Sequence, residues 1–353
     1  MQRDENFAAY YCARIRGMKS NLLGQSQLEA MLDADDLAYL ENALLESPYA
    51  EDLAQARARL EGADAIEDAV SRNLVRTFQH LQKNARGTFR ELTAIVFTRW
   101  DLIAVKMLLR LRRHNVVGEE AIQSITPGPT LTIALIKDFL ERDSMGALVE
   151  GLKAWNPELC VGLDEAMGTY RETERVEVLE EALDRAYFVD NARRLAGWSG
   201  DDAQYVREFL RMEIDRINLR TIFAFRGAGA SAQEILERML PDGHLPRKAL
   251  RGMAEASSPE NAMEFLGSTR YSDFIEGLYQ YIQTGMFSRM ERYFELLLLQ
   301  RVRRIARVEG TSIAVLIHYL WLKYNEVVNL RLIARGKARH LPRGLVREEV
   351  LYA

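Results

Sequence analysis

The sequence predicts an all-α fold built from three similar helical domains around a pseudo-threefold axis. Apolar residues recur at spacings of three and four in every long regular stretch, which is the period of an amphipathic helix. No stretch alternates with a period of two, and none of the eight prolines interrupts a long periodic segment. A motif that returns about every 110 residues predicts the threefold division.

The helical period predicts helices over residues 7–23, 74–80, 89–113, 131–140, 176–195, 203–225, 262–265 and 287–305. Between them, T-P-G-P-T (126–130) and L-P-D-G-H-L-P (240–246) have the composition of turns. The most apolar run, residues 313–322, contains His318 and is shorter than the roughly 18 residues that a membrane span needs. We therefore expect a buried core helix there and no transmembrane segment.

The composition is that of a folded protein, with 48% hydrophobic and 28% charged residues in a chain of 353. A net charge of -4 does not favour nucleic acid as a partner. Cys12 and Cys160 cannot form a disulfide framework, and the N-terminal M-Q-R-D-E-N lacks the apolar core of a signal peptide. These features predict a protein of the reducing cytoplasm.

The repeated motif consists of an acid, a second residue three positions later and a cation five positions later. It occurs as W-D-L-I-A-V-K, I-D-R-I-N-L-R and N-E-V-V-N-L-R, and the acids are 114 and 111 residues apart (101 to 215, then 215 to 326). The copies consist of Asp101, Ala104 and Lys106, of Asp215, Asn218 and Arg220, and of Glu326, Asn329 and Arg331.

Two shorter elements also recur. Leu44–Tyr49 and Leu266–Tyr271 both place leucine and tyrosine five apart with a hydroxyl residue between them, and we interpret residues 148–155 as a degenerate middle copy. The sequence H-L-P-R occurs at 244–247 and at 340–343. The period exceeds the roughly 20–50 residues of solenoid units, so we predict helical domains at residues 1–125, 126–240 and 241–353 that can close around one axis.

Helical geometry separates the acid and the cation of one copy. Five residues turn through roughly 500°, so the two side chains lie about 140° apart and cannot pair with each other. Either each acid caps or hydrogen-bonds a neighbouring helix while the cation is solvated, or the three copies line a shared cavity or contact a partner. The candidate partner-contact or inter-domain residues are Asp101, Lys106, Asp215, Asn218, Arg220, Glu326, Asn329 and Arg331.

Further basic residues follow two of these motifs. This candidate basic rim consists of Arg110, Arg112, Arg113, Arg335, Lys337 and Arg339. It could face lipid headgroups or the helix C-termini of a partner, or it could be a solvated helix end whose cations are favoured by the helix dipole.

Catalytic motifs are missing from the sequence. There is no phosphate-binding G-x-x-x-x-G-K-[ST], no G-x-S-x-G and no zinc-binding H-E-x-x-H, and the five histidines are scattered. Cys12 lies beside Tyr10 and Tyr11 on an apolar helix, which is typical of a core residue rather than a nucleophile. We therefore expect no catalytic residue, no metal site and no cofactor.

Several segments together resemble one protein family. These are Y-Y-C-A-R-I-R-G-M-K (10–19), the twice-present Leu-x-x-(Ser/Thr)-x-Tyr element, Y-N-E-V-V-N-L-R-L-I-A-R-G-K (324–337) and L-P-R-G-L-V-R-E-E (341–349). They are similar to the C subunit of the bacterial and archaeal V-type (A-type) ATPase/synthase, and to the d subunit of the eukaryotic enzyme. The chain departs from that pattern at Ala104 and in the missing middle tyrosine element.

The resemblance implies a funnel of three helical domains that sits on the membrane proteolipid ring and accepts the foot of the central shaft. Such a protein is a non-catalytic rotor component, present once per complex and peripheral to the membrane, in ion or proton transport coupled to ATP hydrolysis or synthesis. Two alternatives remain at this point: a soluble helical-repeat scaffold unrelated to a membrane machine, and an all-helical enzyme with an unrecognised site.

Overall fold

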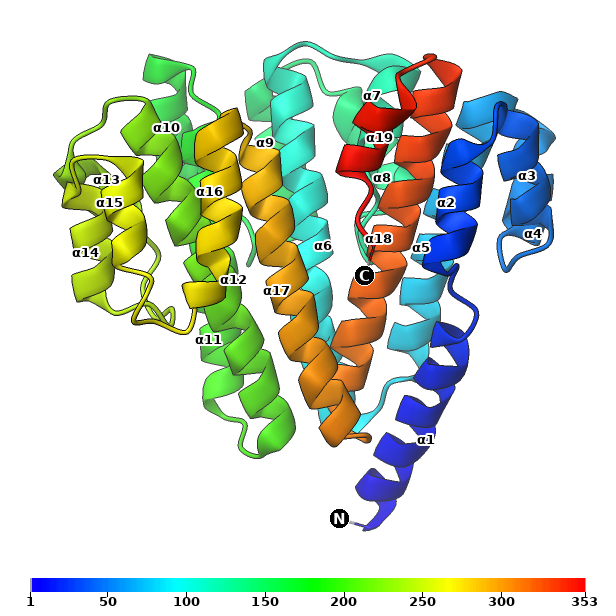
Figure 1. Cartoon of the computed structure of the whole chain (residues 1–353), viewed down its shortest axis with the longest axis horizontal. Coiled ribbons are helices and arrows are strands. Elements are labelled where there is room, and N and C mark those ends of the chain that lie inside the picture. Colours follow the sequence, from blue (N-terminus) through cyan, green and yellow to red (C-terminus); the bar gives the residue numbers. More distant parts are fainter. Residues whose placement is uncertain (1, 353) are drawn as a thin grey trace. The chain divides into compact units, whose positions relative to one another are not determined.

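The computed structural model describes residues 2–352 and, except at residues 2–5 and 288, their side chains. All the regular secondary structure of these residues is helical, which confirms the predicted all-α class (Figure 1). Met1, the first residue of the predicted first repeat, and Ala353, the last residue of the predicted third repeat, lie outside the described residues. No helix within 2–352 has both the length and the apolar content to cross a membrane.

The chain divides into two compact units, residues 1–191 with 309–353 (unit 1) and residues 192–308 (unit 2). The helices of unit 1 are α1 (Gln2–Lys19), α2 (Gln25–Asp33), α3 (Leu37–Leu45), α4 (Ala50–Arg57), α5 (Gly62–Asn84), α6 (Gly87–Arg113), α7 (Gly118–Ser124), α8 (Ile133–Leu140), α9 (Met145–Trp155), α10 (Leu163–Thr173), α18 (Ile313–Ala338) and α19 (Arg343–Glu349). Helix α11 (Glu177–Ala196) begins in unit 1, and its last residues belong to unit 2.

Unit 2 continues with α12 (Asp201–Gly227), α13 (Ala232–Arg238), α14 (Arg247–Glu255), α15 (Pro259–Glu264), the short 3₁₀ helix η1 (Ser272–Phe274), α16 (Ile275–Thr284) and α17 (Phe287–Val308). The predicted division into three repeats remains a prediction.

Local sequence sets many of these helix ends. Asp36 caps α3 by accepting a hydrogen bond from the Tyr39 N–H, and Ser231 and Glu234 form a capping box at the start of α13. Helix α12 ends at Gly227, and Gly229 then adopts a left-handed φ of 80° that glycine accommodates easily. The side chains that start and stop these helices are therefore recognisable in the sequence.

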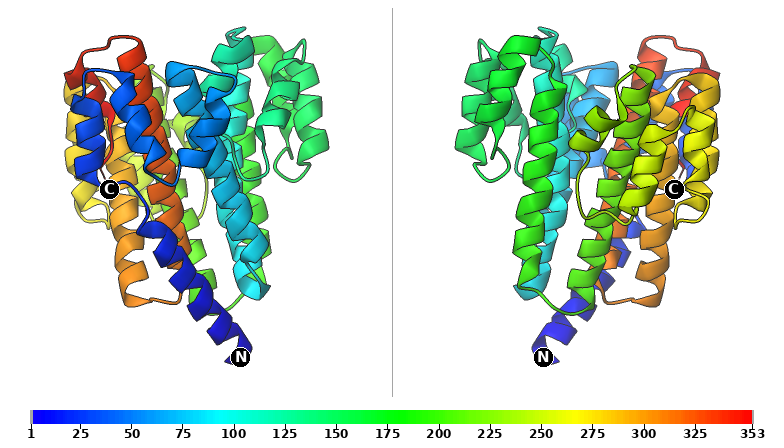
Figure 2. Two further views of the ribbon diagram at one scale, coloured as in Figure 1. Left: turned by 90° about the vertical axis from the view of Figure 1, so that its right-hand side faces the viewer. Right: turned by 90° about the vertical axis from the view of Figure 1, so that its left-hand side faces the viewer.

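The core of unit 1 forms where α18 packs against α5 and α1 (Figure 1). The apolar run 313–322 lies within α18 and is buried except for Leu322, as predicted. Trp321 of α18 meets Trp100 of α6 edge-on, with 5.4 Å between ring centroids. The start of α1 extends past the ends of α5, α6 and α18 (Figure 2). Phe7 of α1 meets Phe89 of α6 edge-on, with 6.3 Å between ring centroids.

The core of unit 2 forms around α12, which packs against α13, α14 and α17. Phe294 of α17 stacks on Tyr271 at 5.6 Å and meets Phe274 edge-on at 5.0 Å. Aromatic pairs of this kind add to the free energy of burial. They hold the Leu266–Tyr271 element against the long α17.

Two sequence expectations are wrong in detail. The helix predicted to reach residue 23 ends at Lys19, because residues 20–23 form a turn whose last N–H is used by a side chain of α18. The two H-L-P-R segments are not equivalent: residues 244–247 lie 29 residues after Asp215, whereas residues 340–343 lie only 14 after Glu326. The first segment leads into α14, the second helix after α12, whereas the second segment leads into α19, the first helix after α18.

Candidate functional site: the repeated acid and cation links

The three repeated acids are buried, with exposed fractions of 2% for Asp101, 0% for Asp215 and 4% for Glu326. Each lies near the middle of a long helix, in α6, α12 and α18 respectively. An ionised carboxylate away from water must be satisfied by hydrogen-bond donors or by a cation. The donors in this protein come from segments distant in the sequence.

Asp101 binds the turn that leads into α8. Its Oδ1 accepts hydrogen bonds from the N–H groups of Thr130 and Leu131, at 3.0 and 2.9 Å, and its Oδ2 accepts one from the Thr130 hydroxyl at 2.8 Å. Burial raises the pKa of Asp101 to about 6, although these three bonds oppose the rise. The carboxyl is therefore an anchor for the turn.

Asp215 binds the equivalent turn before α14. Its two oxygens accept the N–H groups of His244 and Leu245, at 2.8 and 3.1 Å, and the Tyr271 hydroxyl donates to Oδ2 at 2.6 Å. Burial raises the pKa of Asp215, and the hydrogen bond from Tyr271 is the largest opposing effect. The tyrosine of the Leu266–Tyr271 element thus serves as a donor to the repeated acid.

Glu326 binds the turn before α2. It accepts the Leu23 N–H and, at 2.6 Å, the hydroxyl of Tyr49, which ends the Leu44–Tyr49 element. The buried ammonium of Lys323 donates to the same carboxylate at 3.0 Å and to the Tyr49 hydroxyl at 2.7 Å. The middle copy of the tyrosine element, residues 148–155, has no tyrosine at the equivalent position, and at Asp101 the Thr130 hydroxyl is the donor instead.

These bonds have a cyclic order along the chain. The long helix that ends the predicted first repeat binds the turn that opens the second, and the second binds the third in the same way. Helix α18, at the end of the third, binds the turn that opens the first. Each acid therefore contacts the turn before another helix, and the last contact brings together residues about 300 positions apart.

The asparagine of the motif is a second anchor. The Asn218 amide accepts from the Leu240 N–H at 2.8 Å and donates to the Leu240 carbonyl at 2.9 Å. Asn329 makes the same pair of bonds to Leu351, at 3.0 and 2.8 Å. Both partners lie 22 residues after the asparagine, and Ala104 cannot make such bonds.

The cations of the motif also have carboxylate partners, so the expectation that they are solvated is wrong for the two that are largely buried. Lys106 pairs with Asp184, and Arg331 lies 3.4 Å from Glu67. Arg220 is more exposed and lies 3.2 Å from Glu291. The partners lie on α11, α5 and α17, the helices that precede the long ones in each repeat.

Most of the candidate basic rim is likewise bonded inside unit 1. Arg110 pairs with Glu180, Arg112 donates to the Leu140 carbonyl, Arg113 pairs with Glu174, Arg335 pairs with Glu67, and Lys337 donates to the Leu32 and Ala34 carbonyls. Arg339 is exposed and forms no ion pair among the described residues. The rim thus stabilises helix ends through local bonds.

The model of the ATP synthase (C/AC39) subunit family matches residues 11–349 of the chain. The chain belongs to this family. As a member of the C/AC39 family, it is a component of a rotary ATPase.

Proteins named as the C subunit of the A-type ATP synthase are similar along nearly the whole chain. That of Methanococcoides burtonii is 28% identical over 97% of this chain and 94% of its own length. Those of Methanothermobacter thermautotrophicus and Haloferax volcanii are 27% and 26% identical, over 96% and 97% of this chain and 86% and 97% of their own lengths. These relatives agree with the resemblance inferred from the sequence motifs.

Two glycines of this C/AC39 protein lie directly against the repeated acids. A Cβ at Gly128 would lie 2.1 Å from Asp101 Oδ1, and one at Gly243 would lie 2.1 Å from Asp215 Oδ1. Neither distance leaves room for a side chain. The sequence marked both glycines as turn residues but contained no indication that an acid approaches them.

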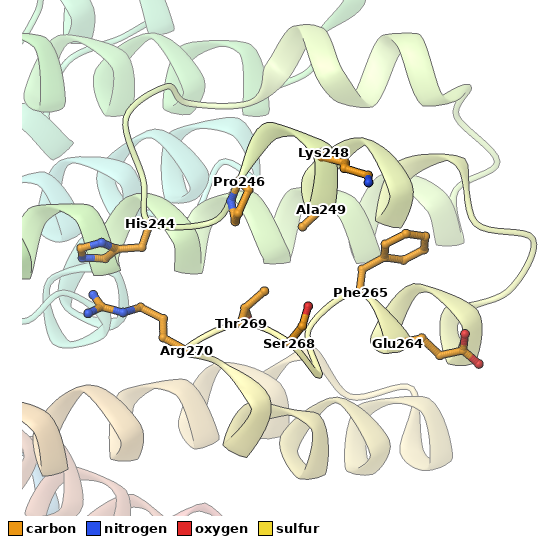
Figure 3. Close-up of a pocket in the computed structure, with 9 residues that line it drawn as sticks. All are labelled: His244, Pro246, Lys248, Ala249, Glu264, Phe265, Ser268, Thr269 and Arg270. Atoms are coloured by element: carbon orange, nitrogen blue, oxygen red, sulfur yellow. The ribbon is translucent and has the colours of Figure 1, made fainter.

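A groove that sequence reasoning missed lies in unit 2, with a volume of about 680 Å³ (Figure 3). Its lining includes His244, Arg270 and Phe265, the last of which is 40% exposed. His244 and Arg270 both pair with Glu208, whose pKa falls to about 2, chiefly through its hydrogen bond with His244. This acid therefore compensates the charge of Arg270 and binds the His244 ring at that end of the groove.

Within the described residues, no group of three or more His, Cys, Asp or Glu side chains is arranged to hold a metal ion. Cys12 and Cys160 are both buried, and burial raises the pKa of the Cys160 thiol to about 12. A thiol with such a pKa is a poor nucleophile near neutral pH.

Proposed function

We propose that this C/AC39 protein is a non-catalytic component of the central stalk and rotates with it. It links the central shaft to the membrane proteolipid ring during ion transport coupled to ATP hydrolysis or synthesis. It is peripheral to the membrane on the cytoplasmic side and is present once per complex. The family match from residue 11 to residue 349 carries the proposal, because it leaves almost no region of the chain for another function.

The repeated links support a mechanical role. An adaptor that transmits torque must resist internal opening, and each long helix is tied to a distant turn by a buried carboxylate with two or three donors. Charge-assisted hydrogen bonds of this kind are stronger than neutral ones. Their cyclic order suits a closed body of three domains around a pseudo-threefold axis, with the funnel shape that the resemblance implies.

The same geometry supports the absence of catalysis by the repeated acids. A general acid or base must reach a substrate. The oxygens of Asp101 and Asp215 are occupied by main-chain N–H and hydroxyl donors, and both side chains are almost fully buried. Their role in this proposal is to fix one repeat to the next.

Arg339 is the rim residue best placed for a partner. It is exposed at the end of α18, whereas the other rim cations are bonded inside unit 1. In our proposal its guanidinium contacts carbonyls or carboxylates of a neighbouring protein in the complex. An exposed arginine of this type can be changed with little effect on folding.

Recovery of the complex tests the proposal. The tagged chain is purified from detergent-solubilised membranes of the source cells at low and high salt, and the bound proteins are identified by mass spectrometry. We expect shaft subunits and the proteolipid to be recovered. We expect the variant Arg339→Glu to recover less of them, and Arg171→Glu, the same charge change on the exposed side of α10, to behave like the unmodified chain.

Failure to recover either partner at any salt concentration would contradict the rotor role. Equal recovery by the two charge variants would remove Arg339 as a contact and leave the rotor role intact. The alternative of a scaffold unrelated to a membrane machine is disfavoured by family membership.

A further inference from the structure

A second hollow lies in unit 1, lined by residues of α1, α5 and α18 and of the loops beside them, with a volume of about 340 Å³. It is distinct from the groove of unit 2 and has no assigned role. Its polar lining includes Arg14, Asn21, Arg76, His80, Tyr319 and Lys323. The hollow therefore joins the N-terminal helix to the last long helix of the chain.

The lining carries cations from all three helices and no carboxylate. Arg14 belongs to α1, Arg76 to α5 and Lys323 to α18. Such a concentration of one charge in a hollow favours an anion, because field lines are focused where protein walls exclude water.

Lys323 is the fixed member of this cluster. Its side chain is only 5% exposed, and two of its three N–H donors are used by Tyr49 and Glu326. One donor remains for a ligand. A charged group held this firmly loses little conformational entropy when an anion binds.

The two arginines differ in whether a carboxylate already binds them. Arg76 pairs with Glu51 at 3.0 Å and with Asp52 at 2.7 Å. Arg14 is exposed, lies 3.5 Å from the Tyr10 hydroxyl and pairs with no carboxylate among the described residues. Its guanidinium is therefore free to turn toward a bound anion.

Neutral donors and one imidazole complete the wall. Asn21 and Tyr319 offer amide and hydroxyl groups, which bind phosphate oxygens as arginine and lysine do. The Thr77 hydroxyl donates to the Asn73 carbonyl at 2.8 Å. The pKa of His80 is lowered by burial first and then by the charges of Arg14 and Lys83. Carboxylates outside the lining already pair with Arg76 and Lys323, so Arg14 supplies the charge of the hollow that no carboxylate of the described residues compensates.

We propose that the hollow between α1, α5 and α18 binds a small phosphate-bearing anion, held by Arg14, Arg76 and Lys323. The phosphate belongs either to a soluble molecule or to a lipid headgroup. Binding bridges the N-terminal helix to α5 and α18, and a ligand that binds only the folded state raises its stability. The proposal does not depend on the rotor role.

Titration of the full-length protein tests the site. Calorimetry and thermal unfolding are followed with inorganic pyrophosphate, and sodium chloride replaces it at the same ionic strength in the control. Vesicles of phosphatidylcholine with and without phosphatidic acid test the lipid source. We expect pyrophosphate or the phosphatidic-acid vesicles to bind and to raise the unfolding temperature, with a larger effect than chloride.

Matched arginine variants locate the binding. Arg14→Gln is expected to weaken binding about tenfold, the usual effect of losing one hydrogen bond to a charged group. Arg72→Gln changes an arginine one turn from Arg76 on α5 that does not line the hollow, and it should leave binding unchanged. The NMR signals of the His80 ring, assigned with His80→Gln, should shift on binding.

Each outcome decides the proposal. A tenfold loss confined to Arg14→Gln, together with a shift of the His80 signals, supports it, and the probe that binds identifies the soluble or the lipid source. Equal binding by Arg14→Gln and Arg72→Gln, a stabilisation no larger than that from chloride, or no binding of either probe would overturn it.

Discussion

The substitution Glu326→Gln tests whether the buried link between the last long helix and the first repeat stabilises unit 1. The amide keeps the size of the side chain, but its single oxygen can replace only one of the two carboxylate oxygens. The Leu23 N–H donates to Oε2 and the Tyr49 hydroxyl to Oε1, so one of these acceptors is lost. It removes the negative charge that lies 3.0 Å from the ammonium of Lys323, where both side chains are about 5% exposed or less. The variant therefore removes the charge together with one acceptor.

The structure sets the magnitude. Breaking a buried ion pair by removing one partner costs about 3–5 kcal/mol, because the other charge stays buried without compensation. Unit 1 comprises residues 1–191 and 309–353, or 236 residues. For a body of that size, each kcal/mol corresponds to roughly 2–4 °C, so we expect the melting temperature of unit 1 to fall by about 10 °C.

The assay is urea and thermal unfolding followed by circular dichroism and by the fluorescence of Trp100 and Trp321, both in the core of unit 1. The double variant Lys323→Met with Glu326→Gln is the control, since it removes both charges. It should be markedly more stable than the sum of the two single losses predicts.

The pH dependence provides a second check. Burial lowers the pKa of Lys323, and Glu326 opposes that shift. In Glu326→Gln the folded state should hold the proton less well than the unfolded state, so the variant regains stability as the pH rises above neutrality. A loss below about 1 kcal/mol, or a double variant as unstable as the summed single losses, would refute the ion-pair argument.

Three further changes probe the other anchors. The pKa of Asp101 is raised to about 6, above its ordinary value, so protonation of Asp101 stabilises the folded state at low pH, and this stabilisation is lost as the pH rises through about 6. Asp101→Asn should remove this pH dependence, and denaturation at pH 4.5 and pH 7.5 would detect the change. Gly128→Ala should destabilise by about 2 kcal/mol or more because a Cβ would lie 2.1 Å from a carboxylate oxygen, whereas Gly146→Ala, with 3.9 Å to the nearest atom, should be neutral or stabilising in the same urea assay. Asn329→Ala should cost about 2 kcal/mol and speed amide exchange at Leu351, and unchanged exchange there would show that the amide does not hold the C-terminal segment.

The sequence alone was sufficient for the all-α class, the place of most helices and the repeat itself. Helical period, turn residues and caps are local properties, and they could be recognised because each helix buries one face and ends at residues such as Gly227. The acid and the cation could be recognised as one motif because three copies keep the same spacing, and two of the copies also keep the asparagine. The motif alone does not show that its side chains are buried, because burial of a charged group requires a bonding partner that the motif does not identify.

The tertiary structure alone decided which groups the motif binds. The partners of Glu326 are Leu23 and Tyr49, about 300 and 277 residues away, and no local pattern links such distant positions. It also decided that Lys106 and Arg331 form ion pairs with Asp184 and Glu67, and that Arg14 and Lys323 line one hollow. The physical reason is that helical period determines which face of a helix is buried, whereas the packing of distant segments determines which donor, charge or cavity that face meets.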